Sequence, residues 1–182
     1  NLTASRPTTS SNGQVVMLSN SLASNYLMWD SQVPALTAAG YRVLRYDTRG
    51  HGGSGVPAGD YSIELLADDA RGIIDVLNID KIHFCGLSLG GMTAQMFATR
   101  YPERLDKLIL CATASYLNIP GVWDERRQTV LDQGIAVIVE PTLQRWFTEQ
   151  GLAAMEAEIR HIRTGIETCL LYTSDAADES TC

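Results

Sequence analysis

The sequence predicts an α/β protein built on a mostly parallel, doubly wound sheet, because short apolar segments alternate with helical ones along the chain. The strand-like segments are rich in β-branched, aromatic and other apolar residues: Gln14 to Ser19, Tyr41 to Tyr46, Lys81 to Cys85 and Lys107 to Ala112. Near-continuous apolar strands are typical of a parallel sheet covered by helices on both faces. A chain of 182 residues, 45% hydrophobic, can form one domain with a substantial core.

Three segments between these strands have helical patterns. Ser31 to Ala39 is followed by Gly40, a residue that commonly ends a helix. Tyr61 to Leu77 repeats apolar residues at the spacing of one helix face. The third predicted helix, Leu89 to Arg100, follows the Lys81 to Cys85 strand almost directly. This order of strand, helix and strand predicts the parallel sheet.

The pattern changes after Ala114. From Gly121 to Gly165 the periodicity is helical, with predicted interruptions at Pro141 and Gly151. Ile135 to Val139 resembles a strand in composition, but a helical interpretation is favoured. We therefore expect residues 1–114 to form the sheet-containing core and residues 115–168 to form a small helical cap inserted after it.

Composition excludes several classes of partner. The net charge of -7 favours neither nucleic acid nor anionic membranes, and no run reaches the ~20 apolar residues needed to span a bilayer. The start of the chain has no apolar run of the signal-peptide kind, so a soluble cytoplasmic protein is expected. The four cysteines form no CxxC pair, which predicts neither a metal site nor a disulfide framework; Cys85 and Cys111 are expected to be buried thiols.

A G-x-S-x-G motif, Gly86-Leu87-Ser88-Leu89-Gly90, stands between a predicted strand and a predicted helix. This context is typical of a nucleophile elbow, in which a strained turn exposes the serine hydroxyl. The amide of Leu89 then lies at the start of a helix, where a free N–H group can stabilise a developing oxyanion. The alternative, a structural turn, is disfavoured by the strand and helix on either side.

An oxyanion hole needs a second amide from the loop after an earlier strand. The loop Ser19 to Ala23, which follows the Gln14 to Ser19 strand, is the candidate, with a plain turn as the alternative. Together with Ser88, these amides would support nucleophilic attack on an ester carbonyl.

Several segments resemble the 3-oxoadipate enol-lactonase family of α/β-hydrolases, over about Val15 to Thr168. The runs that carry the resemblance are Leu18-Ser19-Asn20-Ser21-Leu22, Met28-Trp29-Asp30, Tyr41 to Gly52, Tyr61 to Glu64 and His83 to Met92. The resemblance implies an α/β-hydrolase fold, hydrolysis of a lactone ester to 3-oxoadipate in the bacterial β-ketoadipate pathway, and no cofactor or metal. It also implies that Leu22 occupies the position of the second oxyanion amide.

The resemblance extends into the cap, where Trp123, Arg126 and Trp146 look family-like and are expected to bind substrate. Arg126 lies three residues after Trp123, so the two share a helix face. Its guanidinium could bind the carboxylate of the lactone, with Arg127 and Arg145 as the next candidates. The alternative is a solvated Arg126 on the cap surface with Trp123 in the cap core.

No histidine or acid in the chain occupies the position of a catalytic partner for Ser88. His51 belongs to a family-like loop, Asp47 to Ser54, where structural support is favoured over a role as general base; His83 lies in a strand and His161 in the cap. In the family both partners follow later strands, and the available cap carboxylates are Asp124, Asp132, Glu140 and Glu149. We therefore expect a chain truncated before the last strands of the sheet and, by itself, inactive.

Both ends depart from the family pattern. The polar stretch Asn1 to Asn12 stands where the first strands are expected, and no strand is predicted there. Cys169 to Glu179, CLLYTSDAADE, is similar to a translated transposon-end sequencing adapter. Residues 169–182 are therefore expected to be a non-native tail.

Other functions fit the same motifs. A general carboxylesterase or a cofactor-free haloperoxidase or perhydrolase would use a similar elbow, and substrate assays would separate them from a lactonase. A hydrolase-like scaffold that only binds small molecules is a non-catalytic alternative, which a catalytic Asp and His elsewhere in the gene would exclude. The sequence does not indicate an oligomeric state.

Overall fold

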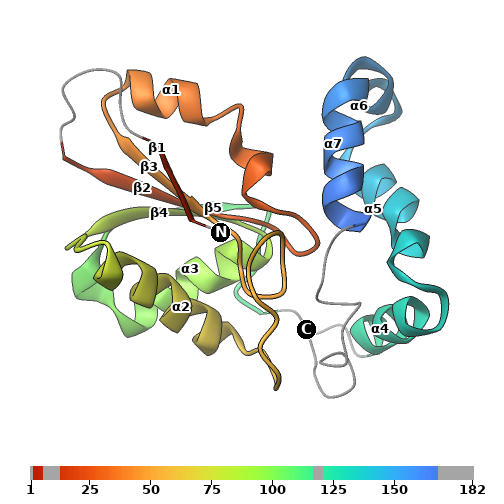
Figure 1. Ribbon diagram of the computed structural model, residues 1–182, viewed down its shortest axis with the longest axis horizontal. Helices are drawn as coiled ribbons and strands as arrows, with labels where there is room; N and C mark the ends of the chain where they lie inside the picture. The colour runs from red at the N-terminus through yellow and green to blue at the C-terminus, as the bar shows by residue number, and fades with distance from the viewer. Residues whose placement is uncertain (1, 6–12, 117–120, 168–182) are drawn as a thin grey trace.

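A five-stranded sheet forms the centre of the computed structural model, which describes residues 2–5, 13–116 and 121–167 (Figure 1). The strands are β1 (Leu2–Ser5), β2 (Val15–Ser19), β3 (Arg42–Tyr46), β4 (Ile82–Leu87) and β5 (Leu105–Cys111). Their order across the sheet is β1-β3-β2-β4-β5. Strands β3, β2, β4 and β5 pair parallel with one another, and β1 pairs antiparallel with β3. The prediction of a mostly parallel sheet is confirmed.

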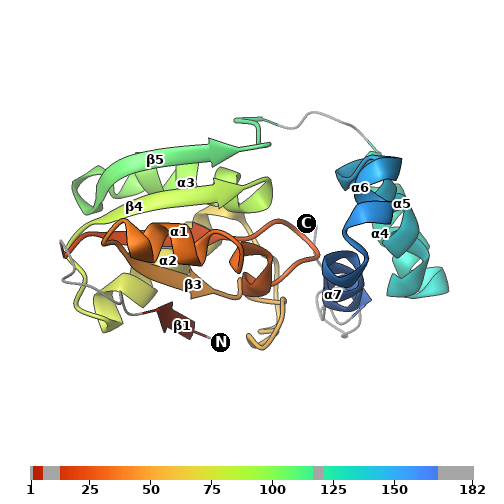
Figure 2. The same ribbon diagram turned by 90° about the horizontal axis from the view of Figure 1, so that it is seen from above.

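Helices cover both faces of the sheet, as predicted. On one face lie α2 (Ile63–Val76) and α3 (Leu89–Arg100), and on the other lies α1 (Val33–Ala38) (Figures 1 and 2). Short 3-10 helices, η1 (Tyr26–Trp29) and η2 (Pro102–Arg104), lie in the connections. Because successive strand residues point to opposite faces, Met17 packs on the α2 and α3 side while Val16 and Leu18 pack on the other.

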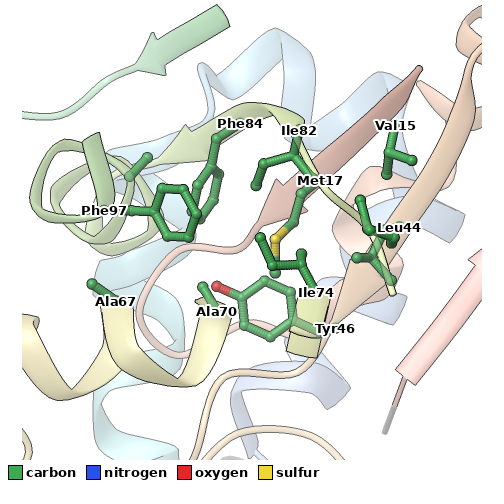
Figure 3. Packing of buried hydrophobic residues seen from close by; sticks show 12 residues of the cluster. Val15, Met17, Leu44, Tyr46, Ala67, Ala70, Ile74, Ile82, Phe84 and Phe97 are labelled. Atoms are coloured by element: carbon green, nitrogen blue, oxygen red, sulfur yellow. The ribbon is translucent and has the colours of Figure 1, made fainter. Parts of the chain in front are cut away.

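The larger core cluster fills the space between the sheet and helices α2 and α3 (Figure 3). Phe84 of β4 and Phe97 of α3 meet edge to face there, with ring centroids 5.3 Å apart. Both side chains are fully buried. Burial of this kind ties α3 to the strand that leads to Ser88, and truncating such a phenylalanine to alanine typically costs about 3 to 5 kcal/mol.

The cap is helical, as predicted, and consists of α4 (Val122–Gln133), the 3-10 helix η3 (Ile135–Ile138), α5 (Val139–Trp146), α6 (Glu149–Ala154) and α7 (Glu156–Glu167). It lies beyond one end of the sheet, the end to which the arrowheads of β4 and β5 point (Figure 2). Its apolar core includes Val130, Leu143 and Ile166, and two residues of the loop after β2, Leu22 and Ala23, pack into the same cluster. The cap is therefore joined to that loop by apolar contact.

The predicted interruptions of the cap were wrong. Pro141 is the third residue of α5, within the first turn, where the missing N–H removes no helical hydrogen bond. Gly151 lies inside α6, and its N–H donates to the Thr148 hydroxyl that caps the helix. The helices end instead near Gly134, which has a φ of 81°, and at Met155.

The prediction that Asn1 to Asn12 contains no strand was also wrong, because Leu2–Ser5 forms β1. This strand pairs Leu2 with Tyr46 and Ser5 with Val43 along the edge of the parallel strands. Main-chain hydrogen bonds to a neighbouring strand need no apolar pattern in a segment of four residues. The proposed tail at residues 169–182 lies outside the described residues.

Strand β5 is the other edge of the sheet, and three of its apolar side chains are partly exposed: Leu108 by 37%, Ile109 by 46% and Leu110 by 44%. Among the described residues, no helix is both long enough and apolar enough to cross a membrane.

Candidate active site

Ser88 lies at the sharp turn from β4 into α3, with a φ of 53° and a ψ of -113°. A positive φ is uncommon outside glycine and stores backbone strain. Three hydrogen bonds hold the turn: the Ser88 N–H donates to the Cys111 carbonyl at 3.0 Å, and the Ser88 carbonyl accepts from the Met92 N–H at 3.0 Å and the Thr113 hydroxyl at 2.7 Å. The main chain of Ser88 is thus fixed, and its hydroxyl does not cap the helix.

Two glycines of the motif permit close approach of neighbouring backbones. A Cβ atom on Gly86 would stand 2.1 Å from the carbonyl oxygen of Gly90, and one on Gly90 would stand 2.3 Å from the carbonyl oxygen of Ser19. Both distances are far below van der Waals contact. The turn and the loop after β2 therefore pack together only because these side chains are absent.

The two segments predicted to form the oxyanion hole lie against each other. The N–H of Gly90, in the first turn of α3, donates to the carbonyl of Asn20 at 3.1 Å. Leu89 is the first residue of α3, where an amide has no carbonyl of a preceding helical turn to bond. Leu22 follows in the loop, with its side chain partly buried against the cap. The structure thus brings the loop of Leu22 to the helix start of Leu89.

His51 supports the loop and is not free to act as a base. Its Nε2 accepts from the N–H of Ala23 at 3.1 Å, and its Nδ1 lies 3.0 Å from the carbonyl oxygen of Arg49. This arrangement requires a neutral ring with the proton on Nδ1. The ring is 1% exposed, and burial lowers the pKa of His51 below its ordinary value. The preference for structural support over general base is consistent with both bonds.

The family-like loop around His51 is braced by Asp47. One carboxylate oxygen of Asp47 accepts from the N–H of Tyr26 and the other from the N–H of Gly53, both at 2.9 Å. The Ser54 hydroxyl donates to the Asp47 carbonyl at 2.7 Å. Arg49 adds an ion pair with Asp69 of α2. The loop is therefore held at its start through Asp47 and tied to α2 through Arg49.

Within the described residues, no histidine hydrogen-bonds to Ser88. His83 is buried in β4, where its ring meets the edge of Tyr41 and its Nδ1 lies 3.4 Å from Asp106. His161 is exposed on α7. The four carboxylates considered above, Asp124, Asp132, Glu140 and Glu149, lie on the cap helices α4, α5 and α6, as predicted.

Cys85 stands three residues before Ser88 but is not a competing nucleophile. Burial, with a smaller contribution from neighbouring Cys111, raises the pKa of the Cys85 thiol to about 12. A thiol with so high a pKa stays protonated at neutral pH. Both cysteines are free, and Cys85 is buried as predicted. The prediction that Cys111 is buried was wrong, because this residue at the end of the edge strand β5 is only partly buried.

Of the three cap residues predicted to bind substrate, Trp123 and Arg126 contact each other, and Trp146 lies on a different helix. On α4 the guanidinium of Arg126 lies 5.8 Å from the ring centroid of Trp123, and its buried Nε has no hydrogen-bond partner among the described residues. Trp146 lies at the end of α5 with 38% of its surface exposed. None of the described contacts joins these side chains to Ser88.

Two residues of the site were missed by sequence reasoning. Asn20 is 1% exposed, and its side-chain amide donates to the carbonyls of Ser21 and Ser24. Ala23 has a φ of 58°. The signal for Asn20 is a polar side chain directly after a buried strand. Nothing in the residue type of Ala23 indicates a left-handed conformation.

A model of the alpha/beta hydrolase fold family matches residues 14–148. The chain is 41% identical over 133 residues to 3-oxoadipate enol-lactonase 2 of Acinetobacter baylyi, a match covering 73% of this chain and 49% of that protein. It thus spans about half the length of the curated relatives it matches.

Solved structures agree. The enol-lactonase from Burkholderia xenovorans LB400 is 36% identical, with a TM-score of 0.88, over 97% of this chain and 68% of that one. A thermophilic esterase from Thermogutta terrifontis, solved with malate bound, is 30% identical, with a TM-score of 0.84, over 98% of this chain and 65% of that one. The strained serine, the fold and these matches together show that the chain belongs to the α/β-hydrolase family and is similar to its enol-lactonases.

Proposed function

We propose that the protein hydrolyses an ester bond with Ser88 as nucleophile and with the amides of Leu22 and Leu89 as oxyanion donors. The observation that carries this proposal is the strained turn at Ser88 together with the bond from the Gly90 N–H to the Asn20 carbonyl. The turn presents a hydroxyl where a strand meets a helix, and the bond holds the second candidate amide beside that helix.

The chemical steps follow from the serine. The Ser88 oxygen bonds to the ester carbonyl carbon while a histidine base takes its proton, and the former carbonyl oxygen carries the negative charge. Collapse of this intermediate breaks the bond to the alcohol or enol oxygen, which takes the proton. Water then releases the acyl group by the same steps. We propose that the base and its orienting carboxylate lie in a segment corresponding to the half of the relatives that this chain does not match.

We further propose a lactone substrate, the enol-lactone of 3-oxoadipate, with 3-oxoadipate as product and no cofactor. The enol-lactonases of Acinetobacter baylyi and Burkholderia xenovorans support this choice. A general carboxylesterase is the second candidate, favoured by the similarity to the Thermogutta terrifontis esterase. The choice depends on whether the cap can bind a carboxylate.

The test uses a joined enzyme, in which residues 1–168 of this chain are followed by the corresponding C-terminal segment of the Acinetobacter baylyi relative. We expect turnover of the enol-lactone that exceeds turnover of neutral esters. Ser88→Ala should lower kcat by about 10⁴-fold or more, because the nucleophile is lost. Ser31→Ala, an exposed serine before α1, is the matched control and should leave kcat unchanged. Equal activity of the Ser88 variant would contradict the proposal.

A second variant tests the substrate. Arg126 combines a guanidinium, a neighbouring Trp123 ring and a buried Nε with no described partner, so it can bind a carboxylate. In the joined enzyme, Arg126→Met should lower kcat/KM for the anionic lactone by about 10-fold to 100-fold, corresponding to a charge-assisted contact of ~1.5 to 3 kcal/mol. Hydrolysis of a neutral ester should barely change.

The matched control is Arg160→Met, since Arg160 is exposed on α7 and, among the described residues, its only ion pair is with Glu156 of the preceding turn. If Arg126→Met lowers kcat/KM equally for the lactone and the neutral ester, Arg126 supports the structure of the cap and does not bind the carboxylate. If kcat/KM does not change for either substrate, Arg127 and Arg145 are the next arginines to test as partners of the carboxylate.

A further inference from the structure

The loop that carries Leu22 is polar but buried. Four residues here are each less than a tenth exposed: Ser19, the last residue of β2, and Asn20, Ser21 and Ser24 of the loop that joins β2 to η1. Burying polar groups is costly unless each one is hydrogen-bonded. The bonds that these groups make therefore show what the loop is built to hold in place.

The peptide group between Ser21 and Leu22 is held by its carbonyl. The oxygen of Ser21 accepts from the Ser24 hydroxyl at 2.8 Å and from the side-chain amide of Asn20 at 3.3 Å. The described residues contain no cis peptide bond, and in a trans peptide the carbonyl and the N–H point in opposite directions. Fixing the Ser21 oxygen inside the loop therefore aims the Leu22 N–H away from Asn20 and Ser24.

The next peptide is held as well. Between Leu22 and Ala23, the N–H of Ala23 donates to Nε2 of His51. The Asn20 amide also donates to the Ser24 carbonyl at 3.0 Å, which closes the loop on itself. Both peptides that flank Leu22 are thus fixed from the buried side, so the direction of its N–H does not depend on a ligand.

Asn20 also connects this loop to α3, the helix that follows Ser88. Its own carbonyl accepts from the Gly90 N–H, one residue after Leu89, and its side-chain oxygen accepts from the Thr48 hydroxyl at 3.4 Å. The orientation of the carboxamide is determined, because the reverse assignment would place its oxygen against two carbonyls. With 1% exposure, Asn20 is too deeply buried to touch a substrate.

We propose that Asn20 is a positioning residue of the oxyanion hole, which sets the Leu22 amide through the Ser21 carbonyl and the Leu89 amide through Gly90. Ser24 assists at the same carbonyl. This inference rests on the proposed function and deepens it. Asn20 acts through the two amides that donate to the oxyanion. The stabilisation is confined to the transition state, in which the negative charge on oxygen develops.

The test compares Asn20→Asp, Asn20→Ala and Ser24→Ala in the joined enzyme. The aspartate keeps the shape of the side chain but loses both N–H donors, and Ser24→Ala is a milder change should Asn20 variants fail to fold. We expect kcat to fall by about 10-fold to 100-fold with KM little changed, less than for complete removal of an oxyanion donor. The affinity for a trifluoromethyl ketone, which forms a charged adduct with serine, should fall by the same factor.

Ser62→Ala is the matched control for loss of stability. Ser62 caps α2 by accepting from the Leu65 N–H at 3.2 Å, far along the chain from the loop, so its variant should melt earlier but keep kcat. Asn20 and Ser24 donate to the same carbonyl. The fold-decrease in kcat of the double alanine variant should therefore be smaller than the product of the decreases in the two single variants.

The outcomes are separable. If the Asn20 and Ser24 variants keep kcat, or lose it only in step with melting temperature as Ser62→Ala does, the inference is wrong while Ser88 retains its role. If Ser88→Ala remains active in the same assay, the proposed function itself is wrong. A rise in KM at constant kcat would instead place Asn20 in substrate binding and would also overturn the inference.

Discussion

At the scale of single residues, the strained serine is the most informative feature of the chain. A non-glycine residue at positive φ typically costs about 1 to 3 kcal/mol and persists only where its surroundings hold it. At Ser88 three hydrogen bonds of its main chain, with the Cys111 carbonyl of β5, the Met92 N–H of α3 and the Thr113 hydroxyl, provide that support. Strain held in this way at a strand-to-helix turn is expected at a catalytic position more than at an ordinary turn.

The buried ring of His51 predicts a pH dependence of stability. Burial lowers the pKa of His51 in the folded protein, while the hydrogen bond to the Arg49 carbonyl and the nearby Asp47 charge oppose the shift. The unfolded chain therefore takes up the proton first as pH falls. The contribution of His51 should be complete above its ordinary pKa of about 6.5 and should decrease as pH falls from there toward the lower folded value.

The measurement is the free energy of unfolding of the wild type and His51→Gln in urea between pH 8 and pH 5. The difference between the two proteins should shrink as the pH is lowered. His161→Gln, on the exposed side of α7, controls for the loss of an imidazole. A difference that stays constant over the range would show that His51 need not be neutral to hold Ala23.

At the scale of elements, the contact between the start of α3 and the loop after β2 depends on a glycine. A Cβ on Gly90 would lie 2.3 Å from the Ser19 carbonyl oxygen, and both partners are main chain. Gly90→Ala should therefore push α3 and the loop apart, lowering stability and reducing kcat of the joined enzyme by at least about 10-fold through the misplaced amides.

Gly72→Ala is the matched control, because Gly72 lies in α2 with nothing within 4 Å of an added Cβ. Alanine there should stabilise the protein by about 0.5 to 1 kcal/mol and leave kcat unchanged. Thermal unfolding and steady-state kinetics on both variants make the comparison. Unchanged kcat in Gly90→Ala would mean that the two elements need not touch for catalysis.

The elements that could be predicted are those with a periodic pattern. The four parallel strands, the helix Leu89–Arg100 and the strand-to-helix turn at Ser88 follow from apolar runs and a motif at their junction. Strand β1 could not be predicted, because it is held by main-chain pairing with β3. The role of Asn20 depends on Gly90 and Thr48, residues far away in the sequence, so its contacts appear only once the chain is folded.

At the scale of the whole molecule, the site is assembled where three parts of the chain meet. The loop after β2 bonds to α3 through Asn20, to the Asp47 to Ser54 loop through His51, and packs Leu22 and Ala23 into the apolar core of the cap. The carboxyl ends of β4 and β5 point toward the cap, which is where ligands bind in open parallel sheets (Figure 2). The cap residues Trp123 and Arg126 remain the proposed substrate contacts.

The central claim is that Ser88 is the nucleophile, and covalent labelling tests it most directly. The joined enzyme is treated with a fluorophosphonate, whose phosphorus–fluorine bond breaks as the serine oxygen bonds to phosphorus, and the modified peptide is identified by mass spectrometry. We predict a single adduct on Ser88, formed at the rate at which lactone turnover is lost and absent from Ser88→Ala. An adduct on another residue that accompanies the loss of turnover, or equal labelling of Ser88→Ala, would contradict the account.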